Sequence, residues 1–290
     1  MKLSIIALNY NSSEKTIYLL RSLQDQTDQD FQTIIIDNAS EETDFKTLST
    51  FVNETTSQVV LLRNEQNLGF SGGNNIGIKK ALTNGSNWMI LLNNDTWVEN
   101  GFITSLKAKL SQLDGVVGVP LVENDQTVYC GNIEWLKPTL KHSYLLPNDR
   151  YRKTVNYAIG GAMALHKDIF NRIGFMDEKY FLYFEDADLS IRTQKAGLKM
   201  IFLEKPKVYH HISSTTKKLG SPLLLRYHYR NALYFNLKNG PWYIKVMLWP
   251  WSWTIILKQI FKVIIYHNRN ESLAILKGVF DFYKNKMGKI

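Results

Sequence analysis

The sequence predicts an α/β fold: a Rossmann-like, mostly parallel sheet followed by a C-terminal helical extension. Short apolar runs rich in β-branched residues alternate with helix-like stretches over residues 1–120. These runs show no polar alternation, which is expected for strands that are covered on both faces. Residues 217–290 instead hold long apolar stretches at helical spacing, and they form the extension.

Helix-like stretches separate the expected strands, and this succession predicts βαβ units with helices on both sides of the sheet. Ile17, Leu20 and Leu23 fall on one helical face behind Asn11, a possible helix cap. Two further helices are expected in GGNNIGIKKAL and in NGFITSLKAKLSQL. The expected strands are LSIIAL (3–8), TIIID (33–37), QVVLL (58–62), WMILL (88–92) and VVGV (116–119).

Residues 120–160 have an irregular pattern that predicts hairpin-like pieces inserted into this series, with prolines at positions 120, 138 and 147. The next stretch, YAIGGAMALHKDIFNRIGFMDE, predicts a strand, a helix and a glycine turn. The acidic segment YFEDADLSIRTQKAG follows directly.

The composition is that of an ordered chain, with 44% hydrophobic and 12% aromatic residues among 290. Cys130 is the one cysteine, so no internal disulfide forms and a reducing compartment is expected. The opening stretch MKLSIIALNYNSSEK has too short an apolar run for a signal peptide. We therefore expect a first strand there, in a protein that stays in the cytosol.

Positive charge is concentrated in the extension. Residues 217–290 carry 13 Lys and Arg against 2 Asp and Glu, a net +11, whereas residues 1–216 carry a net −2. Such asymmetry indicates a polyanionic partner, either nucleic acid or anionic lipid. The aromatic residues of the extension lie among Leu and Ile rather than among basic residues, which disfavours nucleic acid.

The extension also predicts contact with a membrane surface. It contains Trp242, Trp249, Trp251 and Trp253, but Lys245 and Lys258 leave too short an uncharged run to span a bilayer. Tryptophans combined with lysines fit helices that lie in the bilayer interface. The alternative is a helical pair packed on the rest of the chain or on a second copy, as in a homodimer.

Polar clusters follow the expected strands: NYN, DNAS, RNEQNLGFSGGNN and NNDT. Each one alone is ordinary turn chemistry. Four such clusters at the carboxyl edge of one sheet favour a binding crevice, because parallel sheets bind ligands at that edge. The glycine-rich cluster lets the backbone approach a ligand, but its spacing fits neither the dinucleotide fingerprint nor the P-loop.

Three carboxylates in these clusters and in the acidic segment are candidates for chemistry. Asp37 can accept hydrogen bonds from a base or a ribose, and Asp95 is a hard ligand for Mg²⁺ or Mn²⁺, with a helix-capping role as the equal alternative. Asp186 lies beside Glu185 and a run of aromatic residues, where burial and like charge would raise a pKa toward that of a general base. Asp188 is expected in the first turn of the following helix, in a structural role.

Two basic segments complete the candidates. KVYHHISSTTKK offers His210 as a metal ligand, with an ordinary structural histidine as the alternative. RYHYRNALYF offers Arg226 and Arg230 to phosphates, or to a basic helix face.

In order along residues 3–235, these segments resemble the inverting family 2 glycosyltransferases of the GT-A fold, especially the bacterial rhamnosyltransferase-like branch. The matching segments are LNYN, IIIDNAS, RNEQNLGFSGGNN, LLNNDT, GGAMAL, YFEDADLSIRTQKAG, YHHISSTT and RNALYF. The resemblance implies a catalytic domain over 1–216, with a nucleotide-binding half (1–120) and an acceptor half (121–216). The charge and the tryptophans of residues 217–290 predict that these form a membrane-association region.

By this resemblance Asp186 is the catalytic base, assisted by Glu185, and Asp95 is the last position of the DxD motif. Asn93 replaces the first Asp of that motif, which weakens the implied metal site. His210 would face the Mg²⁺ or Mn²⁺ ion, or His211 if the register is off by one. The implied nucleotide-binding residues are Asn9, Asn11, Asp37, Asn67, Gly72, Asn94, Asp95 and Arg230. The implied acceptor-binding residues are Gly160, Gly161 and Glu185.

The implied reaction moves a sugar with inversion from a nucleotide-sugar donor to a lipid-linked saccharide acceptor. The expected donor is dTDP-rhamnose, and the expected site is the inner face of the cell membrane. A UDP-hexose donor is the first alternative. A sugar nucleotidyltransferase would need a basic glycine-rich loop after the first strand, which NYNSSEK does not supply. A non-enzymatic basic binding protein is the remaining alternative.

Overall fold

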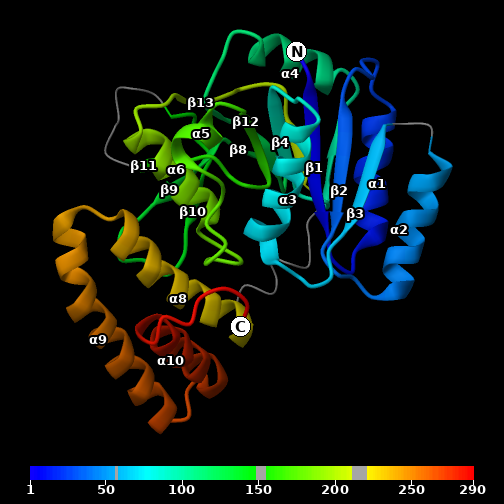
Figure 1. Cartoon of the computed structure of the whole chain (residues 1–290). Coiled ribbons are helices and arrows are strands. Elements are labelled where there is room, and N and C mark those ends of the chain that lie inside the picture. Colours follow the sequence, from blue (N-terminus) through cyan, green and yellow to red (C-terminus); the bar gives the residue numbers. More distant parts are fainter. Residues whose placement is uncertain (56–57, 148–154, 211–220) are drawn as a thin grey trace.

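Figure 1 shows a computed structural model of the chain, which describes residues 1–55, 58–147, 155–210 and 221–290. A seven-stranded sheet lies at its centre, in the order β13-β6-β12-β4-β1-β2-β3. Its strands are β1 (Leu3–Asn9), β2 (Gln32–Asp37), β3 (Val59–Arg63), β4 (Trp88–Leu92), β6 (Val116–Gly118), β12 (Ala162–His166) and β13 (Met200–Phe202). All neighbours pair in parallel except β12, which is antiparallel to both β4 and β6. The mostly parallel sheet is thus confirmed.

Helices cover both faces of the sheet because its strands are apolar on both sides. Leu3 and Ile5 of β1 pack toward α1, α2 and α4, whereas Ile6 packs toward α3, α5 and α6. These helices are α1 (Ser13–Gln24), α2 (Glu42–Glu54), α3 (Gly69–Thr83), α4 (Phe102–Leu110), α5 (Ile169–Ile173) and α6 (Glu185–Lys195). The result is an arrangement of three layers, with the sheet between two layers of helices (Figure 1). The parallel strands β1, β2, β3 and β4 all finish at the same edge of the sheet.

Two details of the sequence-based expectations are wrong or incomplete. The first helix begins at Ser13 behind Ser12, so Asn11 is not its cap. Helix α2 was not expected, although Leu48 is buried against the core with Phe51 and Val52 beside it. That spacing is the amphipathic signal that would have identified the helix.

Short antiparallel pieces fill the region expected to be irregular. Strands β7 (Leu121–Glu123) and β8 (Gln126–Val128) form a hairpin that joins β5 (Thr96–Val98) and β14 (Val208–His210) in a four-stranded sheet. A three-stranded sheet contains β9 (Cys130–Ile133), β10 (Lys141–Ser143) and β11 (Val155–Tyr157). The first of these sheets brings β14 against the end of β4.

The extension is helical, as expected, and consists of α8 (Pro222–Asn239), α9 (Trp242–Ile264) and α10 (Arg269–Tyr283). Ala232 and Phe235 of α8 pack with Phe184 and Ile191 around α6, so this helix belongs to the catalytic half as much as to the extension. Figure 1 shows α9 on the outside of the molecule, away from the central sheet. Within the described ranges, no helix is both long and apolar enough to cross a membrane. The predicted domain boundary at 216/217 lies outside the described residues.

The buried carboxylate of Asp188 joins α6 to α8, which agrees with the structural role expected for it. It accepts hydrogen bonds from Arg192 Nε (2.7 Å), Asn239 Nδ2 (2.7 Å) and Tyr180 Oη (3.2 Å), and Lys238 Nζ lies at 2.8 Å. The helix begins at Glu185 rather than at Asp188, so Glu185 and Asp186 lie in its first turn and not before it.

We predict that Asp188→Asn lowers the free energy of unfolding by about 3–5 kcal/mol, because it removes the charge that compensates two partly buried cations. Asp114→Asn is the control, since its side chain is 56% exposed and pairs with the exposed Lys199. This control should cost less than about 1 kcal/mol. Urea titration of both variants measures the difference, and equal losses would contradict the structural role of Asp188.

Candidate active site

The nucleotide end of the candidate site lies where β1 and β2 finish side by side. Asp37 accepts hydrogen bonds from the side-chain amide of Asn9 (2.9 Å) and from the backbone N–H of Ser40 (3.1 Å). The same amide donates to Asp44 of α2 (2.8 Å). Asp37 is completely buried in this arrangement, so its carboxylate joins the end of β1 to the turn that follows β2.

Arg63 is a residue at this end that the sequence analysis did not single out, although it opens the quoted segment RNEQNLGFSGGNN. Its Nε lies 3.6 Å from Asp37 Oδ2, and its guanidinium lies 4.1 Å from the centre of the Phe45 ring. It is partly exposed and places a fixed cation at the carboxyl edge of β3. Asn11 lies nearby and accepts a hydrogen bond from the backbone N–H of Glu41 (2.7 Å).

The glycine-rich turn folds against the acidic segment. Asn67 Oδ1 accepts hydrogen bonds from the backbone N–H of Gly69 (2.8 Å) and from Asn38 (3.0 Å). Gly69 has φ +72°, and a Cβ there would lie 2.2 Å from the carbonyl oxygen of Phe181, so only glycine fits. Gly72 lies in the first turn of α3, close to Leu68.

The NNDT segment leads from β4 to a charged group on β14. Asn94 donates to the hydroxyls of Ser12 (2.7 Å) and Thr16 (2.9 Å). Asp95 Oδ1 lies 3.0 Å from His210 Nε2, and Lys15 Nζ is 3.9 Å from Asp95 Oδ2. The segment therefore connects the start of α1 to His210 of β14.

A second carboxylate lies behind His210. Glu123 Oε1 is 3.0 Å from His210 Nδ1, and Glu123 Oε2 is 3.3 Å from His142 Nδ1. Burial opposes protonation of the His210 ring, but the hydrogen bonds with Asp95 and Glu123 outweigh it and raise the pKa of His210 to about 9. His142 and His210 lower the pKa of Glu123 to about 2.

The group of Asp95, His210 and Glu123 fits a metal site with few protein ligands better than one in which the protein supplies every ligand. A metal-binding histidine usually has a carboxylate behind its second nitrogen, as His210 has in Glu123. Two ligands of one octahedral ion at about 2.1 Å lie about 3.0 Å apart, which matches the Asp95–His210 separation. In the part of the chain that the structure describes, no three His, Cys, Asp or Glu side chains converge on one point. Substrate phosphates and water would have to complete the coordination.

Gly160 and Gly161 join the NNDT segment to Asp186. The backbone N–H of Asn93 donates to the carbonyl of Gly161 (3.0 Å), and a Cβ on Gly161 would lie 2.7 Å from the Asn93 amide. The backbone N–H of Gly160 donates to Asp186 Oδ2 (3.0 Å). Three predicted positions, Gly160, Gly161 and Asp186, thus lie in one series of contacts that begins at Asn93.

Glu185 and Asp186 have the perturbed ionisation expected of them. Burial, followed by the charge of Asp186, raises the pKa of Glu185 well above 4.5. Burial also raises the pKa of Asp186 above 3.8, although the N–H of Gly160 opposes this shift. Glu185 is only 5% exposed, and its Oε2 has no hydrogen-bond partner among the described residues. This oxygen is enclosed by the protein, so the acceptor-binding role of Glu185 stays a prediction.

Arg230 is not where its predicted role requires. Its side chain is completely buried, and it donates to the carbonyl oxygens of Tyr180 (3.1 Å) and Gly288 (2.8 Å) rather than facing the crevice. Arg226 likewise pairs with Asp281 of α10 at 2.6 Å. His211, the fallback for His210, lies outside the described residues.

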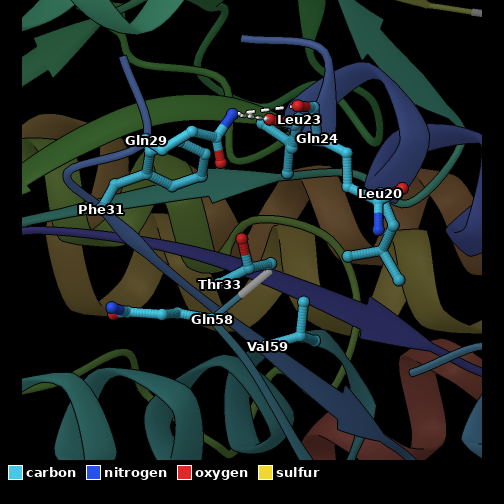
Figure 2. A pocket seen from close by; sticks show the side chains of 8 residues that line it. All are labelled: Leu20, Leu23, Gln24, Gln29, Phe31, Thr33, Gln58 and Val59. Carbon is cyan, nitrogen blue, oxygen red and sulfur yellow. Dashed lines mark hydrogen bonds between the residues drawn. The ribbon is translucent and has the colours of Figure 1, made fainter. Parts of the chain in front are cut away.

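Figure 2 shows a small pocket at the opposite, amino-terminal edge of the sheet. Gln29 lies over it and donates to the backbone carbonyls of Leu23 and Gln24 at the end of α1. None of the predicted site residues lines this pocket. It is a gap between the end of a helix and the starts of β2 and β3.

Residues 4–174 match the Glycosyl transferase family 2. The chain belongs to this family. A dTDP-rhamnosyl transferase RfbF of Shigella flexneri is 23% identical over 242 residues, which are 81% of this chain and 79% of that protein. An N-acetylglucosaminyl-diphospho-decaprenol L-rhamnosyltransferase of Mycobacterium tuberculosis is 24% identical over 136 residues, or 46% of this chain and 43% of that protein.

Solved structures support the same fold. GalNAc-T7 with UDP, GalNAc and Mn²⁺ gives a TM-score of 0.60 at 19% identity, over 79% of this chain and 47% of that one. The mannosyltransferase PcManGT from Pyrobaculum calidifontis, in complex with GDP-Man and Mn²⁺, gives 0.58 at 10% identity, over 98% and 87%. At these identities the likeness shows the GT-A fold alone. The chain is therefore a family 2 glycosyltransferase of the GT-A fold, as the resemblance implied.

We predict that Asp186→Asn lowers glycosyl transfer by about 10²–10⁴-fold, since the variant removes a base without changing its shape. The pKa of Asp186 is raised, so this base becomes protonated at a higher pH than an ordinary aspartate of pKa 3.8. As the pH is lowered, the wild-type rate should therefore begin to fall at a higher pH. Steady-state rates across pH measure both effects, and nucleotide binding by ligand-observed NMR is the control that should not change. Near-wild-type turnover by the variant would exclude Asp186 as the base.

Proposed function

We propose that this glycosyltransferase transfers L-rhamnose from dTDP-rhamnose, with inversion, to a lipid-linked precursor of a surface polysaccharide. The observation that carries the proposal is the continuous contact from Asn93 through Gly161 and Gly160 to Asp186. It places the half-buried carboxylate of Asp186, whose pKa is raised, beside the segment that would meet the diphosphate of the donor. The names of the Shigella and Mycobacterium relatives favour rhamnose as the sugar.

In the proposed reaction Asp186 takes the proton of an acceptor hydroxyl while that oxygen attacks the anomeric carbon of the donor sugar. The bond to the nucleoside diphosphate breaks on the opposite side, so one displacement inverts the configuration. Glu185, which precedes Asp186 in the first turn of α6, would help to orient the acceptor. Asn9, Asp37 and Arg63 would form the nucleoside end of the crevice, and Lys15 would lie near the diphosphate.

We also propose Mg²⁺ or Mn²⁺ as a cofactor. Asp95 and His210 would hold the ion, with Glu123 fixing the orientation of His210. Such an ion supplies positive charge that stabilises the departing diphosphate. His210 would have to release a proton to become a ligand.

A UDP-hexose donor remains the second candidate. A low-salt glycan biosynthesis hexosyltransferase Agl10 of Haloferax volcanii is 25% identical over 206 residues, which are 68% of this chain and 63% of that protein. Donor choice depends on contacts to the sugar ring, which the hydrogen bonds of the crevice floor do not determine.

The test of function is turnover with a panel of donors, namely dTDP-rhamnose, UDP-glucose, UDP-GlcNAc and GDP-mannose, on a polyprenyl-diphosphate saccharide. We expect product from dTDP-rhamnose, loss of product with excess EDTA and its return with Mn²⁺ or Mg²⁺. Product from a UDP-sugar alone would reject rhamnose, and full activity in EDTA would reject the metal. Absence of product from every donor, with nucleotide binding intact, would reject this acceptor class.

We further propose that α9 attaches the enzyme to the inner face of the cell membrane. One side of this helix packs inward through Ile244, Leu248 and Ile255. Its outer side is exposed and apolar at three- and four-residue spacing, with Trp253 59%, Leu257 64% and Ile264 67% exposed. This stripe consists of Trp242, Val246, Trp249, Trp253, Leu257, Ile260 and Ile264.

Charge favours a lipid surface over a second copy of the chain as the partner of this stripe. Lys245 and Lys258 are exposed on the same helix, in a region of net +11. Two copies would bring these like charges together, whereas anionic lipid head groups attract them by about 1 kcal/mol for each basic residue. Tryptophan also favours the interface between head groups and hydrocarbon.

We predict that the full-length enzyme co-sediments with phosphatidylglycerol vesicles more strongly than with phosphatidylcholine vesicles. Salt should weaken the binding without abolishing it, because the apolar stripe stays inserted. The triple change Trp249→Ser, Trp253→Ser and Leu257→Ser should reduce binding at least about 10-fold, whereas Tyr144→Ser with Leu145→Ser, exposed elsewhere, should not. Point changes are preferable to truncation because Gly288 binds Arg230.

One result would contradict the membrane proposal: the wild-type enzyme stays in the supernatant and elutes as a dimer that the triple change separates. The stripe would then be an interface between two copies. The membrane proposal would then be rejected while the transferase activity stands.

A further inference from the structure

The backbone directly before the two candidate acids is held in an unfavourable conformation. Phe181, Tyr183 and Phe184 have φ values of 64°, 72° and 75°. Large side chains rarely adopt this left-handed region, and such residues persist only where their surroundings hold them there. We call residues 180–184 the base loop, because Glu185 and Asp186 follow it immediately.

One asparagine of α8 binds most of the carbonyl groups of the base loop. Asn231 Nδ2 donates to the carbonyl oxygens of Tyr180 (2.9 Å), Leu182 (2.7 Å) and Tyr183 (3.1 Å). The remaining carbonyl, that of Phe181, accepts from the backbone N–H of Phe70 at the start of α3 (2.6 Å). Asn231 is completely buried. A single side chain therefore fixes three of the four carbonyls that precede Phe184.

The asparagine is itself fixed in place by its neighbour. Arg230 Nε donates to Asn231 Oδ1 (2.9 Å), and this bond orients the amide so that its NH₂ group faces the loop. The Arg230 guanidinium also donates to the carbonyls of Tyr180 (3.1 Å) and Gly288 (2.8 Å). Arg230 thus joins three segments that are far apart in the sequence.

Ring contacts from the same helix support the loop. Tyr183 stacks on His228 with a centroid separation of 3.9 Å, and Phe181 stacks on Tyr227 at 5.4 Å. Phe184 packs against Phe235 at 5.3 Å, so all three unfavourable residues rest on α8. Their rings limit rotation, whereas the Asn231 amide supplies the α8 donor for the carbonyls of Leu182 and Tyr183.

We propose that Asn231 is a positioning residue for the base: it holds the base loop so that Asp186 stays in hydrogen-bond contact with Gly160. The proposal rests on the proposed function, because it takes Asp186 as the base. It assigns a task to Asn231, a residue outside the acidic segment. It also places a determinant of the active site in α8, within the region that the sequence assigns to membrane association. Removal of the amide takes the side-chain donor from the carbonyls of Leu182 and Tyr183, while Arg230 still donates to that of Tyr180. The loop would therefore relax next to Glu185, and Asp186 would move.

The test compares full-length Asn231→Ala with Asn236→Ala. Asn236 is a matched control because it is buried in the same helix and accepts from the backbone N–H of Leu136 (3.1 Å), outside the base loop. Hydrogen exchange should become at least about 10-fold faster at residues 180–186 in the first variant only. Its kcat should fall about 10–100-fold while the donor KM changes little, because displacement of a catalytic group by about 1 Å has effects of this size.

The pH dependence gives a further readout that a merely structural residue would not change. Relaxation of the loop would admit water to Asp186, and its pKa would return toward 3.8. The acid side of the rate profile should therefore move to lower pH in Asn231→Ala and not in Asn236→Ala. If Asn231→Ala does not fold, Asn231→Ser, which keeps one donor, should show the same changes in smaller degree.

The outcomes separate this proposal from the proposed function. Unchanged exchange at residues 180–186, or faster exchange spread evenly over the chain with kcat unaffected, would overturn the positioning role. Local loosening combined with a fully active Asp186→Asn variant would overturn Asp186 as the base. It would also overturn the catalytic part of this proposal, leaving Asn231 as a support of the loop alone.

Discussion

A parallel sheet ends all of its strands at one edge, and the candidate site depends on this constraint. Asn9 and Asp37 are paired residues of β1 and β2, and the NNDT segment leaves the next strand along, β4. Hydrogen bonds through Thr16 connect Asn9 to Asn94 across that edge. Residues that are far apart in the sequence are thus neighbours because their strands run in the same direction.

The electrostatics of the site follow from the same arrangement. Asp95 is nearly buried, yet it lies close to His210 and Lys15, so its charge is compensated within the protein. Glu123 compensates the second side of the His210 ring. Within the described ranges no ion pair involves Glu185 or Asp186, and burial raises the pKa of both. The two ends of the site therefore differ in ionisation: Asp95 and Glu123 are held as anions against cations, whereas burial favours the protonated forms of Glu185 and Asp186.

Local sequence pattern was sufficient for the sheet and for much of the site. The five strands expected over residues 1–120 are present, because apolar β-branched runs report burial on both faces. The sequence pattern also distinguished a structural role for Asp188, whose carboxylate binds four partners, from a candidate catalytic role for Asp186, which contacts Gly160. Arg230 was placed wrongly because its surroundings come from Tyr180 and Gly288, which no local period relates to it. Glu123 and Arg63 were missed for the same reason: their importance depends on which partner the fold brings to them.

The single reversed strand of the sheet has a consequence for how such enzymes can diversify. Because β12 runs antiparallel to β4, Ala162 pairs with Leu92, and the two glycines before it arrive directly at Asn93. The chain between β6 and β12 is anchored in these two adjacent strands, and short antiparallel strands occupy much of its described part. One of them, β7, carries Glu123, whose contacts with His210 and His142 limit how this strand can change. The exposed turn at residues 124–126 can instead lengthen or change sequence without shifting Asn93, Gly160 or Gly161, which the anchoring strands hold in place.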